Sequence, residues 1–148
     1  MSISALINLD FAERLDCKIN ATNIIKCLIN NGWRINCNHK ISYIPLGDNG
    51  MYNWQEKELS YADFYEIIKQ KEIANEDIGV DIYWKNTEIG LSLLIFSDLK
   101  VTLILSINRV KIDLQDIDIT DSSWYLQRII PYLYKDKMVV VRYTFIQD

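Results

Sequence analysis

The sequence has few of the residues on which catalytic and cofactor-binding motifs depend. Its five glycines are too few to build a loop of backbone N–H groups around a phosphate, and it contains no P-loop, GxGxxG or GxSxG pattern. It has one histidine, His39, so a metal site with several histidine ligands is excluded and a catalytic Cys–His pair could use only this residue. We therefore expect no cofactor and no enzymatic activity, and the function must be argued from other features.

Long hydrophobic runs are also missing. No stretch approaches the ~20 apolar residues that a membrane-spanning helix needs, and the first residues lack the basic and apolar segments of a signal peptide. The three cysteines, Cys17, Cys27 and Cys37, are an odd number without a CxxC pair, so we expect reduced and mostly buried thiols. These features predict a cytoplasmic protein without membrane contact.

The charge balance is mildly acidic. Sixteen Lys and Arg against 20 Asp and Glu give a net charge of −4. Because phosphate binding depends on clustered Lys and Arg, this balance argues against a direct nucleic-acid partner and is compatible with a basic protein partner. The length of 148 residues and the 49% hydrophobic content predict a single domain over residues 1–148 with one core.

The most informative stretch, residues 79–113, predicts a three-stranded meander. Residues 86–90 and 97–100 supply turn chemistry between β-branched and aromatic runs. The second strand, residues 91–96, is apolar on nearly both faces and should be central. Residues 138–146 form another strong strand pattern, which should rejoin the sheet.

Three segments have helical patterns. Residues 20–31 begin with a capping Asn20 and are followed by Gly32, and a second helix opens at Ser60. The third, residues 122–130, can be capped by Thr120 or Asp121 and should stop or kink near Pro131.

Helices and strands together predict an α+β fold, with a mainly antiparallel sheet of about five strands and helices packed on one face. Residues 3–15 fit either a helical stripe or an alternating strand.

Metal and acid–base chemistry have weak candidates. Cys37 and His39 are two residues apart, which is not a usual zinc spacing, and Cys27 lies on a predicted core face. Carboxylates are plentiful, but general acid–base work needs them to converge in a cleft. We expect no metal site and mostly solvated carboxylates.

Two segments are candidate interfaces for a protein partner. The connector 113–121 carries four carboxylates within nine residues, which suits electrostatic steering of a basic partner. The loop 47–59 combines acidic residues with two aromatic side chains, which suits the centre of an interface. Their candidate residues are Asp48, Tyr52, Trp54, Glu56, Glu58, Asp113, Asp116, Asp118 and Asp121. The alternatives are a solvated connector that caps the next helix and a Trp54 that covers the core.

Four segments together have a familiar arrangement: YIPLGDNGMYNW (43–54), IGVDIYWKNTEIG (78–90), LSINRVKI (105–112) and TDSSWYLQRIIPYL (120–133). This arrangement resembles immunity proteins of bacterial contact-dependent growth inhibition systems. The resemblance implies a protein that binds and neutralises the C-terminal toxin domain of a cognate effector and so protects the producing cell. Many such toxins are nucleases with basic clefts, so a basic nuclease domain is the expected partner.

Two other hypotheses about the function are compatible with the sequence. One is a different intracellular adaptor domain without catalysis. The other is a small enzyme or ligand-binding domain, which predicts an apolar pocket with convergent titratable groups. Long apolar edge strands are also compatible with a homodimer that forms by pairing of strand edges.

Overall fold

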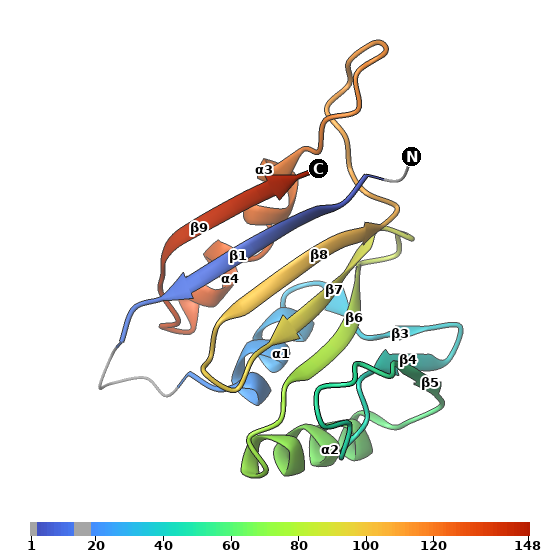
Figure 1. The fold of residues 1–148 in the computed structure, drawn as a ribbon, viewed down its shortest axis with the longest axis vertical. Helices are drawn as coiled ribbons and strands as arrows, with labels where there is room; N and C mark the ends of the chain where they lie inside the picture. The colour runs from blue at the N-terminus through green and yellow to red at the C-terminus, as the bar shows by residue number, and fades with distance from the viewer. Residues whose placement is uncertain (1–2, 14–18) are drawn as a thin grey trace.

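The chain folds into one antiparallel sheet with helices on one side (Figure 1). The computed structural model describes residues 3–13 and 19–148. Its strands are β1 (Ala5–Phe11), β2 (Trp33–Arg34), β3 (Asn36–Cys37), β4 (Lys40–Tyr43), β5 (Gln55–Lys57), β6 (Ile78–Trp84), β7 (Gly90–Ile95), β8 (Val101–Ile107) and β9 (Val140–Gln147). The order across the sheet is β3-β4-β6-β7-β8-β1-β9, with β2 paired to β6 and β5 paired to β4.

The predicted meander is confirmed and forms the middle of this sheet. β6, β7 and β8 follow one another in sequence and pair antiparallel as neighbours. In β6 the residues Val80 and Ile82 are buried while Asp81 and Tyr83 are half-buried, as expected for a strand with one face on the core. β7 is central and almost wholly buried, which explains why its sequence is apolar in nearly every position.

The first and last strands of the chain are neighbours. Of the two interpretations of residues 3–15, the alternating strand is correct for Ala5–Phe11, because β1 pairs with β8 on one side and with β9 on the other, while residues 14 and 15 lie outside the described residues. Beyond them, Ser4 and Asp148 exchange two backbone hydrogen bonds, at 3.3 and 2.9 Å. The described ends of the chain therefore lie side by side, and β9 is an edge strand.

One face of the sheet is covered by the four helices of the described residues: α1 (Ala21–Asn30), α2 (Tyr61–Ile73), α3 (Ser122–Leu126) and α4 (Ile130–Lys135). Both predicted N-caps are confirmed, since the side chains of Asn20 and Ser60 accept hydrogen bonds from backbone N–H groups three residues on. Gly32 follows α1 with a φ of +109°, a conformation in which glycine is the favoured residue.

The core lies between the helices and this face. Ile7, Leu9, Leu93 and Leu103 from the strands are at most 1% exposed. At about 1.5–3 kcal/mol for each buried aliphatic side chain, such contacts dominate the favourable energy of the fold. Among the described residues, no helix has the length and apolar character needed to cross a lipid bilayer.

Three expectations need correction. The sheet has nine strands among the described residues rather than about five, because β2, β3 and β5 are two or three residues long and show no hydrophobic alternation. The loop expected over residues 47–59 contains one of them, β5. The third predicted helix is two helices, because α3 ends at Leu126 and Pro131 lies in the first turn of α4, where its missing N–H costs nothing.

Candidate protein-binding surfaces

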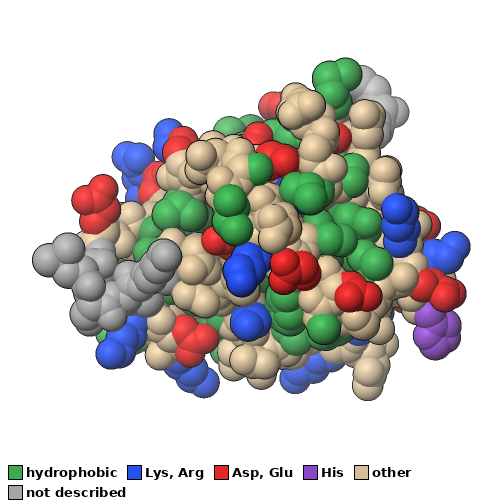
Figure 2. Space-filling model, turned by 90° about the horizontal axis from the view of Figure 1, so that it is seen from below, with side chains coloured by type: hydrophobic (Ala, Val, Ile, Leu, Met, Phe, Trp, Pro, Cys, Tyr) green, Lys and Arg blue, Asp and Glu red, His purple; other side chains and the backbone are tan. Residues whose placement is uncertain are grey.

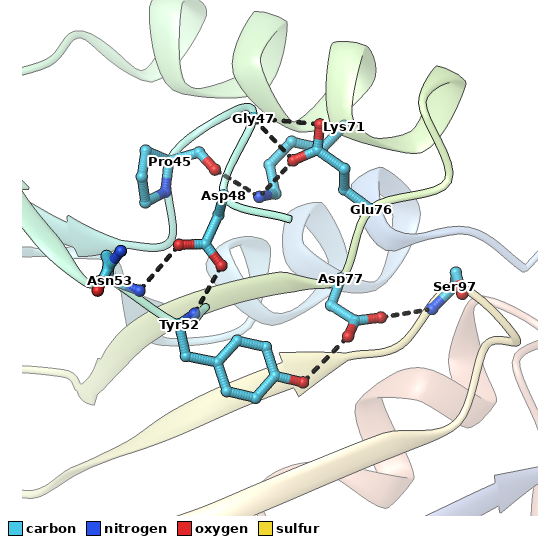
Figure 3. Close-up of polar contacts among 9 residues, drawn as sticks. All are labelled: Pro45, Gly47, Asp48, Tyr52, Asn53, Lys71, Glu76, Asp77 and Ser97. Carbon is cyan, nitrogen blue, oxygen red and sulfur yellow. Dashed lines mark hydrogen bonds and ion pairs between the residues drawn. The ribbon is translucent and has the colours of Figure 1, made fainter. Parts of the chain in front are cut away.

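A buried lysine from α2 fastens the loop of residues 44–54 to that helix (Figure 3). The Nζ of Lys71 donates to the carbonyl oxygen of Pro45 at 2.7 Å and lies 3.2 Å from the Glu76 carboxylate, and its side chain is wholly buried. The same carboxylate accepts a hydrogen bond from the Gly47 N–H. This contact connects α2, the start of β6 and the 44–54 loop.

Asp48 stabilises the inside of this loop. Its carboxylate accepts hydrogen bonds from the N–H groups of Tyr52 at 2.7 Å and Asn53 at 2.8 Å. Burial alone would raise the pKa of Asp48, but those hydrogen bonds and the charge of Lys71 outweigh it, so the pKa is lowered. The side chain is 9% exposed, so it presents little surface to a partner.

Tyr52 and Trp54 fix the other side of the loop. The Tyr52 hydroxyl donates to Asp77 at 3.0 Å, and Asp77 also accepts from the Ser97 N–H. Trp54 lies against Gly79 of β6, where a Cβ would come within 2.9 Å of its ring. Both aromatic side chains remain partly exposed, so Trp54 covers the sheet and also reaches the surface.

Glu56 and Glu58 flank this loop on and after β5, and both are exposed. Figure 2 views the molecule from the lower end of Figure 1, where α2 and the 44–54 loop lie. Acidic and basic side chains are interspersed there, with hydrophobic side chains between them. This end of the molecule therefore carries no surface of a single charge sign.

The acidic connector forms a projecting ribbon at the opposite end, which we call the arm (residues 109–121; Figure 1). Its two sides are joined by the Lys111–Thr120 bridge and by backbone hydrogen bonds from Ile112 to Ile119 and from Asp121 to Val110, each 2.9 Å long. The arm is thus a short hairpin with a tip near residues 114–117, and not an unstructured connector.

Charged and polar side chains pair with one another at the base of the arm. Asp118 accepts two hydrogen bonds from Arg109, at 2.7 and 2.9 Å, and lies 3.9 Å from the Lys111 ammonium. Thr120 contacts Arg109 and also donates to the Gln147 side chain of β9. The polar contacts therefore fasten the arm to the last strand of the sheet.

The remaining carboxylates of the arm differ in their environment. Asp113 and Asp116 are exposed near the tip. Asp121 caps α3 by accepting from the Trp124 N–H at 3.3 Å, as one of the two sequence-based alternatives predicted. The structure does not bring Asp113 and Asp116 together with Tyr52 and Trp54, since the arm and the 44–54 loop lie at opposite ends of the long axis.

The open face of the sheet carries polar residues that sequence reasoning missed. The cross-strand register places Glu56, Ser42, Asp81 and Ser92 in one row. Ser92 donates to Asp81 at 2.6 Å. Burial raises the pKa of Asp81, hydrogen bonds from Ser92 and Ser42 oppose the rise, and the Glu56 carboxylate adds to it. Only the strand register, which the sequence does not show, makes these residues neighbours.

The residues considered for metal binding and thiol chemistry do not form a site among the described residues. Among the described residues no three His, Cys, Asp or Glu side chains are placed to hold a metal ion together, and Cys17 lies outside the described residues. Cys27 is buried, and burial together with Asp136 raises its pKa to about 12. A thiol with that pKa is protonated at neutral pH and a poor nucleophile.

A groove on the open face has a volume of about 580 Å³ and is lined by polar groups that include Asp10, Asp77 and Arg142. Arg142 forms an ion pair with Asp10 at 2.9 Å across β9 and β1. This groove, the 44–54 loop and the arm are the candidate binding surfaces of the described residues.

No protein-family model, no curated protein and no solved structure matches the chain.

Proposed function

We propose that this protein is an immunity protein that binds the C-terminal toxin domain of a contact-dependent growth inhibition effector and neutralises it. The proposal rests on the sequence resemblance described above, and two of its segments, residues 105–112 and 120–133, flank the tip of the arm. Neutralisation by binding requires no catalytic group in this chain, only a stable surface that occludes the toxin.

The structural observation that supports the proposal is the arm. It extends from the sheet, it is fastened at its base by ion pairs and hydrogen bonds, and its tip exposes two carboxylates between aliphatic side chains. A standard interface buries roughly 800 Å² on each partner. A preordered arm lowers the entropic cost of forming such an interface.

The expected toxin is a nuclease with a basic cleft. Asp113 and Asp116 near the tip and the net charge of −4 suit such a cleft, because opposite charges speed encounter and set orientation. An adaptor domain that binds another protein is the alternative, and it differs in having no toxin as its partner.

Co-expression tests the proposal. A tagged form of this chain is produced with a catalytically weakened form of the C-terminal domain encoded by the adjacent upstream gene. We expect a stoichiometric complex that survives high salt, and survival of cells that carry the active toxin. If neither complex nor protection is observed, the immunity function is wrong and the adaptor alternative takes its place.

A further inference from the structure

The arm has two chemically different faces. Lys111 pairs with Thr120, so the next pair toward the tip, Ile112 and Ile119, points to the opposite side of the ribbon. The polar face is occupied by the contacts of Arg109 and Thr120 described above. Ile112 and Ile119, on the other face, are not part of the hydrophobic core formed by the described residues.

That second face is aliphatic and exposed. Beyond Ile112 and Ile119, the same two-residue step leads to Leu114 and Ile117 at the tip. The four side chains are 44, 39, 49 and 56% exposed in the order Ile112, Ile119, Leu114 and Ile117. A loop that is merely solvated has no reason to keep four large aliphatic side chains in water, so this face is suited to contact another molecule.

We propose that the aliphatic face of the arm is the anchor that inserts into an apolar groove of the toxin domain, with basic residues of the groove's rim meeting Asp113 and Asp116. This inference rests on the proposed function and goes beyond it. It assigns the main binding energy to Ile112, Leu114, Ile117 and Ile119 and gives the carboxylates a steering role. It also removes the 44–54 loop from the central contact.

A second copy of this chain is a poorer occupant of the same face. Two arms meeting tip to tip would bring Asp113 and Asp116 of one copy near the same residues of the other, and like charges in opposed positions are unfavourable. A stable dimer also buries roughly 1,200–2,000 Å² in total, and four half-exposed side chains per copy supply only part of that area. A groove of a toxin domain that encloses the arm can contact both faces of the arm and so bury a larger area.

The test uses the full chain and the purified, catalytically inactive toxin domain from the adjacent upstream gene. The double variant Leu114→Ser/Ile117→Ser removes the aliphatic tip, and we expect a dissociation constant at least about 30-fold higher, measured by calorimetry. Ile73→Ser is the matched control, because Ile73 is an isoleucine outside the arm, on α2, that is 68% exposed. Its effect should stay below about threefold.

Two further variants distinguish the role of the aliphatic face in affinity from the role of the carboxylates in the rate of association. Asp113→Asn/Asp116→Asn should chiefly lower the association rate and its dependence on salt, with less than about a tenfold change in affinity. Ile117→Glu places a charge on the aliphatic face and should weaken binding as the serine variant does. Both serine residues replace exposed side chains, so the unfolding midpoint should not change.

The outcomes are distinguishable. If the unaltered chain does not bind the toxin domain, the proposed function fails. If it binds and Leu114→Ser/Ile117→Ser binds equally well, the anchor assignment is overturned while the function stands. If light scattering shows a dimer that the serine variant converts to a monomer, and toxin affinity is unchanged, the face is a contact between copies and the inference is wrong.

Discussion

At the scale of single residues, Lys71 is a charged side chain that is wholly buried. Its ammonium group is fully buried and is balanced by the Glu76 carboxylate and the Pro45 carbonyl oxygen. Removing one partner of a buried ion pair typically costs 3–5 kcal/mol, because the other charge is left uncompensated. We expect Glu76→Ala to lower the free energy of unfolding by about 3 kcal/mol in urea titration.

Two other variants act as controls. Lys71→Met replaces the buried ammonium by an apolar chain of similar length, and Glu76, 16% exposed, can still bind Gly47 N–H and water. Its cost should therefore be smaller than that of Glu76→Ala. Glu58→Ala removes an exposed carboxylate and should change stability by less than about 0.5 kcal/mol. Equal losses for Glu58→Ala and Glu76→Ala would contradict the role of the buried pair.

Asp81 predicts a dependence of stability on pH. Because the pKa of Asp81 is raised in the folded protein, its favourable contribution is complete below the ordinary value of 3.8 and is lost as pH rises through the folded pKa. Asp81→Asn keeps an acceptor for Ser92 and removes the charge. We expect this variant to be more stable than the unaltered chain at pH 7 and to lose that advantage at pH 3, measured by urea unfolding.

The exposed Asp116 provides the comparison for this prediction. Asp116→Asn replaces an exposed carboxylate and should change the free energy of unfolding by less than about 0.5 kcal/mol. If Asp81→Asn gives the same stability difference at both pH values, ionisation of a half-buried Asp81 is not what limits stability at neutral pH.

At the scale of elements, the sequence predicts a helix or a turn correctly where a single residue type, such as a capping Asn or Ser, determines where the element begins. The capped helices α1 and α2 and the turns of the meander follow from Asn20, Ser60 and the polar segments between apolar runs. β5 could not be predicted, because its three residues are polar and are held only by pairing with β4. The two faces of the arm depend likewise on the Lys111–Thr120 register, so the sequence indicates the carboxylates of the arm but not its aliphatic face.

The 44–54 loop provides a prediction about packing between elements. A Cβ on Gly79 would approach Ile44 Cδ1 at 2.5 Å and the Trp54 ring at 2.9 Å, so the loop lies on β6 only because this position has no side chain. We expect Gly79→Ala to lower the free energy of unfolding by about 1–3 kcal/mol, the usual cost of overpacking.

A double-mutant cycle checks the cause. In a Trp54→Ala background one of the two crowded neighbours is absent, so Gly79→Ala should cost less than in the unaltered chain. Identical costs in the two backgrounds would show that Trp54 does not pack against Gly79. The matched substitution Trp54→Phe keeps an aromatic ring and should leave most of the cost in place.

At the scale of the whole molecule, the sheet separates the two candidate interfaces and brings the chain's ends together. Ser4 and Asp148 are joined by backbone hydrogen bonds beside each other, while the arm projects beyond them and the 44–54 loop lies at the far end. A partner of ordinary size that grips the arm therefore need not touch Trp54. Sequence composition marks both segments as candidate interfaces, but it carries no information about the distance between them.

Circular permutation tests this arrangement and the binding proposal together. Because Ser4 and Asp148 are adjacent, a short glycine–serine linker can join the ends of the chain, and new ends can be opened elsewhere. Opening at the arm tip, between Gln115 and Asp116, should leave the unfolding midpoint nearly unchanged. It should abolish toxin binding, because the aliphatic face loses its hairpin.

Opening the chain between Asp98 and Leu99 is the matched control, since this turn joins β7 and β8 with exposed residues and lies outside the arm. That permutant should fold and should bind the toxin domain as the unaltered chain does. Tight binding by the permutant opened at the arm tip would show that an intact arm is not required. Unfolding of both permutants would instead contradict the adjacency of β1 and β9, because a linker between neighbouring ends should not disturb a sheet that already holds them together.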